Sequence, residues 1–327
     1  MSMLSRTFII ILALCFTFPA HSSLANNKLS FESWLEIFKK EALEKGISAE
    51  TLDKAFKGVK PKPKVVALDR KQPETIQTLQ DYMDTRLTDL RISIGRKKYK
   101  ENRELLQQIE SKYGVQGRFI VAFWGMETSY GRFTGGHYVI AALTTLAYDN
   151  RRAAFFRKQL LDALTIIDQG HISVDKMTGS WAGAMGQTQF MPSTFRAYAT
   201  DGDGDGKINL WESKADAFAS AANYLSSIGW RDDQTWGREV ELPKNFDHSH
   251  VKKKTLKYLK DWQKLGVRKR FGHNLPKRKI KAKIVQPDGK NGRAFIVYPA
   301  NYNAILNWNR SHKFAISIGM LADAIVR

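Results

Sequence analysis

Residues 119–131 read FIVAFWGMETSYG, a stretch with one acid in an otherwise apolar helical pattern. The apolar run Phe119 to Trp124 leaves the predicted helix with little polar face, so we expect the helix to be buried on all sides. Glu127 follows near its end, and Gly131 is suited to end the helix. Burial disfavours the charged form of a carboxyl group, which prepares it to act as a general acid. The same residues also fit a structural Glu that is satisfied by hydrogen bonds or by an Arg partner.

The composition is that of a globular protein preceded by an export signal. The chain has 327 residues, 43% of them hydrophobic and 26% charged, enough for two or three packed subdomains. Arg6, the apolar run Phe8 to Phe18 and the small residues up to Ala25 match the three parts of a secretory signal peptide (1–25). We therefore expect an exported, periplasmic and soluble protein. No later segment has the eighteen or more apolar residues of a membrane span, so no transmembrane helix is expected in the mature chain.

The single cysteine, Cys15, lies inside the apolar run of the signal peptide. Leu14 before it is bulky where lipid-attachment sites need a small residue, so lipid anchoring is not expected. After cleavage at Ala25 the mature chain has no cysteine, and hence neither a disulfide nor thiol chemistry. We expect this mature chain to be a monomer.

The net charge of +20 is concentrated in one segment. Between Lys244 and Lys283 there are fifteen Lys and Arg but only two Asp. Such a segment attracts polyanions, and in an exported protein we expect anionic envelope polymers or other cell-wall enzymes as its partners. No nucleic-acid module accompanies the charge, so nucleic acid is not an expected partner. A well-solvated surface with no partner is the alternative.

Most of the chain has the apolar spacing of helices. A first region, 26–113, is expected to hold two helices within 29–58, the second capped by Ser48, then a linker at 60–64 and two helices within 75–113. The Glu127 helix opens a second region, 114–236, and the last region, 300–327, supplies a C-terminal helix. Further helices are predicted over 138–149, 151–169, 190–199, 212–228 and 311–326.

Residues 237–299 differ from the rest. Short strand-like runs occur at 240–242, 280–285 and 294–298, with a Pro-Asp-Gly turn at 287–289 and a helical piece near 251–265. This pattern predicts a small α+β insertion within a mainly α protein.

Residues 201–212, DGDGDGKINLWE, match the EF-hand calcium loop at its diagnostic positions. Acids stand at loop positions 1, 3, 5 and 12, and Gly206 permits the sharp turn at position 6. The predicted Ca²⁺ ligands are Asp201, Asp203, Asp205, the Lys207 carbonyl, Asn209 and Glu212. Because there is one loop and not two, we expect a structural clip and not a sensor. An acidic surface loop without metal is the alternative.

Several motifs, taken in order, closely resemble the lytic murein transglycosylase B family. They are ETSYG at 127–131, DNRR at 149–152, GSWAGAMGQTQFMPS at 179–193, NYL at 223–225, NY at 301–302, WNRS at 308–311 and AD at 322–323. The resemblance extends from about residue 29 to 327. It implies a goose-lysozyme-like helical core, a helical N-terminal part and a smaller sheet-containing domain.

The resemblance also implies an activity. Members cleave peptidoglycan between N-acetylmuramic acid and N-acetylglucosamine, and the muramic C6 hydroxyl closes onto C1 to leave a 1,6-anhydro sugar. One carboxyl serves as acid and then as base, and Glu127 stands at its position. An intramolecular attack needs no second carboxylate, because proximity supplies the nucleophile.

The resemblance assigns substrate contacts as well. Ser180, Gln189 and Tyr224 match positions that contact the glycan or orient the acid, as do Tyr302, Trp308 and Asn309 in the C-terminal motif. Arg151 and Arg152 match arginines that hold stem-peptide carboxylates, although a structural ion pair is equally compatible with them. Trp308 replaces the tyrosine of some members, so sugar stacking is kept and a hydroxyl contact is lost. Gln187 and Thr188 also depart from other members.

Two other functions are compatible with the sequence. A lysozyme-type muramidase on the same fold would need a second carboxylate, for which Asp149 is the nearest candidate in the sequence. A calcium-stabilised wall-binding protein would need no catalytic acid at all.

Overall fold

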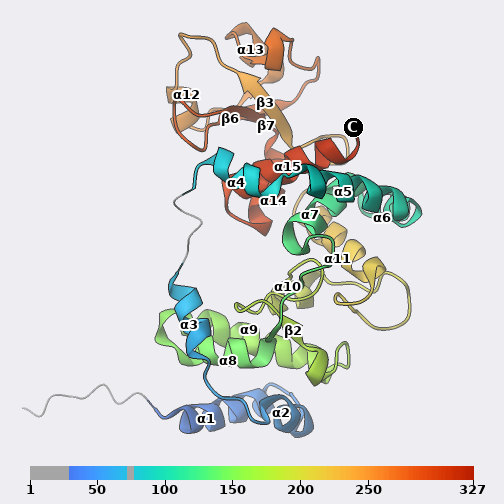
Figure 1. Cartoon of the computed structure of the whole chain (residues 1–327), viewed down its shortest axis with the longest axis vertical. Coiled ribbons are helices and arrows are strands. Elements are labelled where there is room, and N and C mark those ends of the chain that lie inside the picture. The colour runs from blue at the N-terminus through green and yellow to red at the C-terminus, as the bar shows by residue number, and fades with distance from the viewer. Residues whose placement is uncertain (1–28, 72–76) are drawn as a thin grey trace, which may run out of the picture.

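The computed structural model describes residues 29–71 and 77–327, most of which are helical (Figure 1). The fold is mainly α with small sheets, as the sequence predicted. Residues 1–25, which the sequence predicts to be a signal peptide and which include Cys15, lie outside the described residues. Within those residues, no helix is long and apolar enough to cross a membrane.

The helices and strands are listed here in chain order. The helices are α1 (Phe31–Glu44), α2 (Ala49–Phe56), α3 (Pro63–Arg70), α4 (Leu79–Arg86), α5 (Asp89–Glu101), α6 (Arg103–Tyr113), α7 (Gly117–Thr128), α8 (Val139–Tyr148), α9 (Ala153–Asp168), α10 (Pro192–Tyr198), α11 (Lys214–Ser227), α12 (Ser249–Lys252), α13 (Leu259–Lys264), α14 (Pro299–Trp308) and α15 (His312–Ile325). Short 3-10 turns are η2 (Asn150–Arg152), η3 (Val174–Lys176) and η4 (Arg270–Gly272). The strands are β1 (His137–Tyr138), β2 (Thr178–Gly179), β3 (Gly237–Glu241), β4 (Lys257–Tyr258), β5 (Arg268–Lys269), β6 (Lys281–Val285) and β7 (Ala294–Val297).

The helices form two hydrophobic cores. One core joins α1–α3 to α8–α10 through buried side chains such as Phe38, Leu52 and Leu143. The other joins α4–α6 to α7, α11, α14 and α15. The segment 26–113 is therefore helical as expected, but its two halves belong to different cores. The segment 114–236 is divided in the same way.

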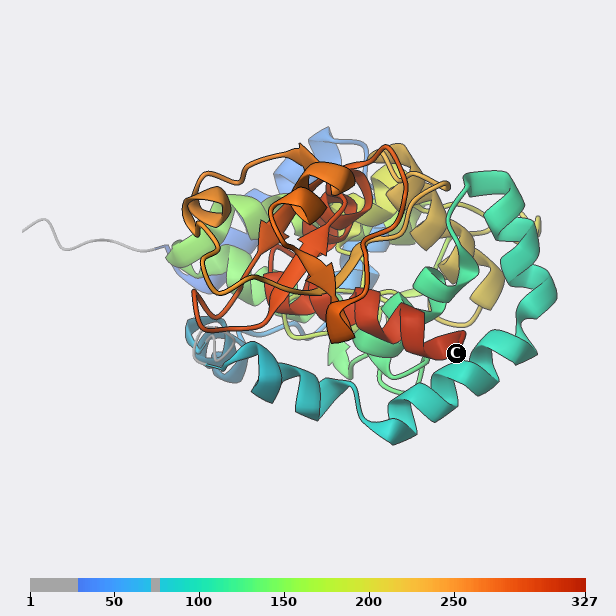
Figure 2. The same ribbon diagram turned by 90° about the horizontal axis from the view of Figure 1, so that it is seen from above.

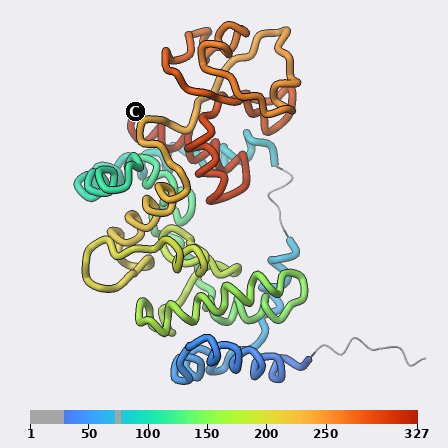
Figure 3. The backbone as a smooth tube through the Cα atoms, turned by 180° about the vertical axis from the view of Figure 1, so that it is seen from behind, coloured from blue at the N-terminus to red at the C-terminus, as the bar shows by residue number. Residues whose placement is uncertain are grey.

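Helices α4, α5 and α6 run one after another along one side of the molecule, outside α15 (Figure 2). They contact α7 and α15, so the helix that carries Glu127 is enclosed by packed neighbours. The N-terminal helices and the sheet-bearing insertion lie at opposite ends of the molecule (Figure 3).

The insertion holds an antiparallel sheet of order β4-β6-β7-β3-β5. Successive residues of a strand point to opposite faces, and β7 uses both faces. Ala294 and Ile296 enter the insertion's own core with Trp262, while Phe295 and Val297 enter the core of α7 and α15. The sheet is thereby fixed onto the helical part.

Most predicted elements are confirmed within a few residues, and the exceptions have local causes. The 75–113 segment forms three helices because Thr88 caps a new helix, α5, directly after α4. The 251–265 piece is broken between α12 and α13, where Lys254 adopts a positive φ of 50° and β4 follows. Helix α3 begins at Pro63 inside the expected linker, since proline is favoured at the first helical position. Ser48 caps α2 as predicted.

Candidate functional site

The candidate acid, Glu127, lies one residue before the end of α7. Phe119 to Trp124 are all buried, as the sequence predicted, whereas Glu127 is partly exposed at the end of the helix. The helix ends earlier than Gly131, because Ser129 (φ 51°) and Tyr130 (φ 65°) already adopt left-handed backbone geometry. Left-handed geometry is uncommon for residues other than glycine, and it turns the chain sharply after the acid.

Neighbouring elements hold this turn in place. The Tyr130 hydroxyl donates to the Arg91 carbonyl oxygen on α5 (2.8 Å), and Arg91 Nη2 donates to Ser129 Oγ (3.2 Å). The Thr128 hydroxyl donates to the Gln187 carbonyl oxygen (2.8 Å), which joins α7 to the Gly-rich segment 179–193. Burial raises the pKa of Tyr130, so its phenol remains a neutral donor.

Glu127 is held by a tryptophan from the C-terminal part of the chain. The indole Nε1–H of Trp308, the last residue of α14, donates to Glu127 Oε1 at 2.9 Å. The Trp308 ring packs against Phe123 (centroids 4.3 Å apart), Phe190 (5.3 Å) and Tyr224 (5.3 Å). A carboxyl oxygen thus has a fixed donor, and the donor's ring is locked by aromatic neighbours.

Tyr224 reaches this cluster from α11. Its ring lies edge-on to Trp308 and to Tyr198, and burial raises the pKa of its phenol. Phe190 is buried in the core. The structure therefore brings Tyr224 and Trp308 together beside Glu127.

The Gly-rich segment 179–193 supplies Ser180 and Gln189, both partly buried. Ser180 Oγ accepts the Ala184 backbone N–H (3.0 Å), and Gln189 Nε2 donates to the Thr134 carbonyl oxygen (3.0 Å). Gly179 is required for close packing, because a Cβ there would lie 2.2 Å from the Ala184 carbonyl oxygen. These bonds form a folded loop tied to the chain that follows Glu127.

Arg151 and Arg152 form a structural ion pair, one of the two possibilities left by the sequence. Arg151 Nη1 contacts Asp69 Oδ2 at 2.9 Å, and Arg152 Nη2 contacts the other carboxylate oxygen. Asp69 is 1% exposed and lies on α3. The two guanidinium groups neutralise a buried acid of this chain, while the side chains of Arg151 and Arg152 stay 44% and 39% exposed.

Tyr302 also differs from expectation, whereas Asn309 is partly exposed. Tyr302 has no exposed surface, and its hydroxyl is 2.8 Å from His312 Nδ1. A fully buried side chain cannot touch a glycan, so its assignment as a substrate contact is corrected to a core role. The Asn309 Oδ1 accepts the Ser311 backbone N–H (3.0 Å), which organises the start of α15.

The acid proposed for a hydrolase, Asp149, is engaged elsewhere. Its Oδ1 accepts Arg70 Nη2 at 3.3 Å, and Arg70 belongs to α3. Nothing about Asp149 favours the two-carboxylate mechanism.

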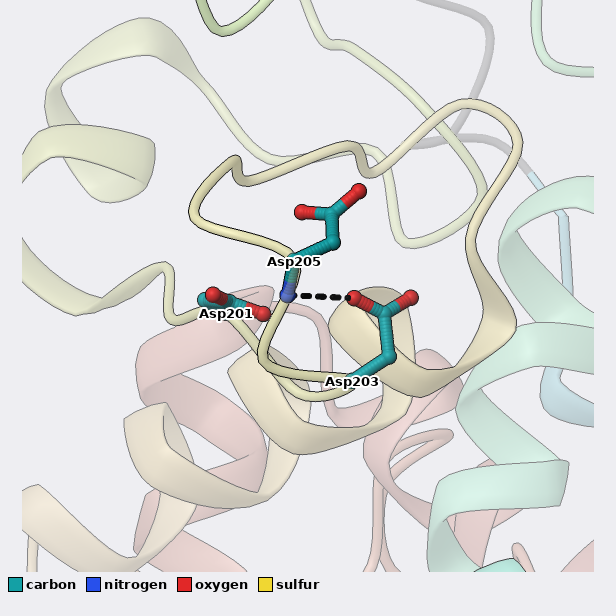
Figure 4. Close-up of side chains that lie close together, drawn as sticks. All are labelled: Asp201, Asp203 and Asp205. Carbon is teal, nitrogen blue, oxygen red and sulfur yellow. Dashed lines mark hydrogen bonds between the residues drawn. The ribbon is translucent and has the colours of Figure 1, made fainter.

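The acidic loop brings three carboxylates together. Ligand oxygens of Asp201, Asp203 and Asp205 lie within 4.8 Å of one another (Figure 4). Asp201 also accepts the backbone N–H groups of Gly206 (2.8 Å) and Gly204 (2.6 Å), and these bonds lower the pKa of its carboxyl group. Clustered carboxylate oxygens suit a hard cation such as Ca²⁺.

The rest of the predicted ligand set is arranged differently. Glu212 is outside this carboxylate group and pairs with Lys176 Nζ at 3.1 Å. Asn209 Oδ1 accepts the backbone N–H groups of Trp211 and Glu212. Lys207 donates its backbone N–H to Asp205 Oδ1 (2.8 Å).

Sequence reasoning missed the residue that anchors the acidic loop. Asp216, 1% exposed on α11, accepts the backbone N–H groups of Gly202 (2.7 Å) and Asn209 (2.6 Å). Burial raises the pKa of its carboxyl group, and these two donors oppose that effect. The sequence does contain a signal for this role, because Asp216 is an acid among the apolar residues at the start of α11.

The chain is similar to known proteins in sequence and in overall structure. The family model for the transglycosylase SLT domain matches residues 30–323. The membrane-bound lytic murein transglycosylase B of Escherichia coli (strain K12) is 32% identical over 220 residues, which are 65% of this chain and 58% of that protein. The chain thus spans less than two thirds of that relative's length.

Two solved structures are similar over nearly the whole chain. SltB3 from Pseudomonas aeruginosa in complex with NAG-anhNAM-pentapeptide has a TM-score of 0.87 and 44% identity, covering 91% of this chain and 80% of that one. The Escherichia coli lytic transglycosylase Slt35 in complex with calcium has a TM-score of 0.76 and 25% identity, covering 95% of this chain and 98% of that one.

Proposed function

The chain belongs to the transglycosylase SLT-domain family, and from this premise we propose that it is a lytic transglycosylase acting on peptidoglycan glycan strands. The proposal rests on the position of Glu127. Its carboxyl group is partly exposed at the end of a buried helix and accepts a hydrogen bond from the Trp308 indole. The SltB3 complex with a 1,6-anhydro sugar ligand supports the same type of product. The reaction is cleavage of the bond between N-acetylmuramic acid and N-acetylglucosamine.

In the proposed mechanism Glu127 acts twice. Its protonated carboxyl gives a proton to the glycosidic oxygen as the bond from that oxygen to C1 breaks. The muramic C6 hydroxyl then bonds to C1, and its proton passes to the Glu127 carboxylate. The carboxyl is protonated again, and no water is consumed. The C6 hydroxyl needs no activating second acid because it is held close to C1 within the same sugar.

Other residues would position the glycan and the acid. Trp308 would fix one Glu127 oxygen through its indole N–H while its ring, with that of Tyr224, borders the reacting sugar. Ser180 and Gln189 would present polar groups from the folded Gly-rich loop. The stem peptides that branch from the bound glycan strand would lie outside these contacts.

We propose that Ca²⁺ binds Asp201, Asp203 and Asp205. The convergence of their oxygens and the calcium complex of Slt35 support this assignment. Asn209 and the Lys207 carbonyl would complete the set. Glu212 would bind the metal only after its ion pair with Lys176 is broken. Bound Ca²⁺ would supply charge neutralisation that stiffens the loop, without a role in bond cleavage.

We also propose that the chain is exported and acts in the periplasm after removal of residues 1–25. The charged, apolar and small-residue parts of that segment support this proposal.

The test is digestion of purified peptidoglycan sacculi, with mass spectrometry of the products. The native chain is expected to release 1,6-anhydro-muropeptides. Glu127→Gln is expected to lower the rate by several powers of ten, because the amide cannot supply the proton. An unchanged rate in this variant would show that Glu127 is not the acid and would favour a wall-binding role.

A further inference from the structure

Three basic side chains lie where the insertion meets the C-terminal helices. Lys283 on β6 and Lys254, which follows α12, belong to the insertion, whereas His312 is the first residue of α15. Both α12 and α14 contact β6. Lys283 Nζ donates to Asn303 Oδ1 on α14 at 3.3 Å and lies 5.9 Å from the centre of the Tyr302 ring. We call Lys254, Lys283 and His312 the junction cluster.

The imidazole of His312 is held in one orientation. Its ring stacks on that of Tyr302, with centroids 5.8 Å apart and 18° between the planes. Among the described residues, the fully buried Tyr302 hydroxyl has one hydrogen-bond partner, His312 Nδ1 at 2.8 Å. Because a buried hydroxyl is costly when its hydrogen is not donated, we assign this hydrogen to the bond with Nδ1. The ring proton of His312 is then on Nε2, and this exposed side chain presents an N–H donor to a ligand.

The charges that act on Lys283 and His312 are positive. Burial and the charge of Lys254 lower the pKa of Lys283, and burial and the charges of both lysines lower the pKa of His312. Within residues 29–71 and 77–327, neither lysine forms an ion pair. The N-terminal end of α15 adds positive potential at His312. Cations that repel one another in this way are stabilised by an anion placed between them.

The junction cluster lies close to the proposed catalytic site. α14 carries Asn303 beside Lys283 and ends at Trp308, whose indole donates to Glu127. Asn303 and Trp308 are separated by about 7.5 Å along the helix axis. An extended peptide of five residues spans up to about 17 Å. A stem peptide on a sugar bound beside Glu127 is therefore long enough to reach Lys283.

The anionic groups of peptidoglycan belong to its stem peptides. The lactyl group of each peptide-bearing muramic acid is in amide linkage and carries no charge, whereas the peptide has free carboxylates. Ammonium and imidazole N–H groups are suitable donors to a carboxylate.

We propose that the junction cluster binds a carboxylate of the stem peptide attached to the glycan at Glu127. The inference rests on the proposed function for the identity of the substrate. Lys283 and His312 donate to the carboxylate, and Lys254 adds charge from the insertion. The chain then favours peptide-bearing strands over bare glycan.

The test compares kcat and KM on peptide-bearing strands with those on strands from which an amidase has removed the peptides. The stripped strands carry lactyl carboxylates instead, so the two substrates distinguish the two sources of an anion. The native chain should have the higher kcat/KM on peptide-bearing strands. Lys283→Gln should lower this preference about tenfold, mainly through KM, because a charge-assisted hydrogen bond is lost. Lys283→Arg keeps the charge and should retain the preference.

Lys264→Gln is the matched control. Lys264 is an exposed lysine on α13, at the end of the insertion that is distant from α14 (Figure 1). This variant should retain the native preference for peptide-bearing strands. If Lys283→Gln does not fold, Lys254→Gln removes an exposed charge of the same cluster and should also lower the preference.

Equal kcat/KM of the native chain on the two substrates would overturn the proposal, as would the same preference in Lys283→Gln as in the native chain. The products report separately on the proposed function. Anhydro products without a Lys283-dependent preference would contradict only this inference. A Lys283-dependent preference with reducing-end products would contradict only the proposed function.

Discussion

At the scale of single residues, the site depends on one hydrogen bond between distant parts of the chain. The Trp308 indole and the Glu127 carboxyl are 181 positions apart and meet at 2.9 Å. The resemblance assigned Trp308 to sugar stacking, and its N–H donation to the acid is an addition from the structure. A donor on one oxygen restricts the carboxyl group to a single orientation.

Trp308→Phe should lower kcat by roughly ten- to a hundredfold, since a hydrogen bond to a charged group contributes about 1.5–3 kcal/mol. The phenyl ring preserves most packing against Phe123 and Tyr224, so the melting temperature should change little. Steady-state release of soluble muropeptides measures the effect. A native kcat in this variant would show that the indole N–H does not orient the acid.

At the scale of elements, the backbone at the end of α7 is held by the packing of the Tyr130 ring on Gly125. A Cβ at Gly125 would lie 2.6 Å from the Tyr130 ring, and a Cβ at Gly95 on α5 would lie 2.5 Å from its hydroxyl. The Tyr130 ring thus packs between α5 and α7, which both have a glycine at the contact. This packing determines the backbone turn after Glu127.

Gly125→Ala should therefore destabilise the protein despite the better helix propensity of alanine. Overpacking costs about 1–3 kcal/mol, which corresponds to a fall of roughly 2–10 °C in melting temperature. Activity should fall as well, because the displaced ring moves the turn beside the acid. Calorimetry and digestion rates measure the two effects.

Gly136→Ala is the matched control, because a Cβ there meets nothing within 4 Å. It should keep the native melting temperature. Equal stability of the Gly125 and Gly136 variants would contradict the packing argument.

Besides the shared hydrophobic core, Asp168 at the end of α9 contributes hydrogen bonds to the N-terminal helix α2. Its Oδ1 accepts the hydroxyls of Ser48 and Thr51 (2.6 Å from Thr51), and these hydrogen bonds lower the pKa of Asp168 below its ordinary 3.8. A lowered folded-state pKa contributes stability above pH 3.8 that is lost as the pH falls through the folded pKa.

Asp168→Asn should accordingly lower the melting temperature at pH 7, and the difference from the native chain should shrink below about pH 4. Thermal scans from pH 7 to pH 2.5 measure it. A difference that grows on acidification would have the wrong sign for this account.

The sequence was most informative where the pattern is local. The buried helix that carries Glu127 was predictable from its apolar run, and the cluster of three carboxylates from the spacing of the acidic loop. The Asp69 pair with Arg151 and the Asp216 anchor were not, because contacts across the fold leave no periodic pattern. Strands of two residues, such as β4 and β5, are too short to show alternation.

At the scale of the whole molecule, the two helical cores border each other at Tyr224 on α11 and Trp308 on α14, which pack against both. The acidic loop precedes α11 and is tied to it by Asp216, so order in the loop is coupled to the helix that carries Tyr224. A ligand that binds only the folded loop stabilises the entire chain by mass action.

Calcium should therefore raise the melting temperature, and excess chelator should reverse the change. At a thousand times the dissociation constant the gain is about 4 kcal/mol. Asp203→Asn should reduce the response, because it removes one of the converging carboxylates. A melting temperature unmoved by calcium and by chelator would reject the metal assignment.

The central claim is that Glu127 serves as acid and base in turn while water takes no part. Digestion of sacculi in H₂¹⁸O, followed by mass spectrometry of the muropeptides, tests it most directly. The expected products have 1,6-anhydro ends that carry no ¹⁸O. Reducing ends labelled with ¹⁸O at C1 would show that water attacks, and would contradict it.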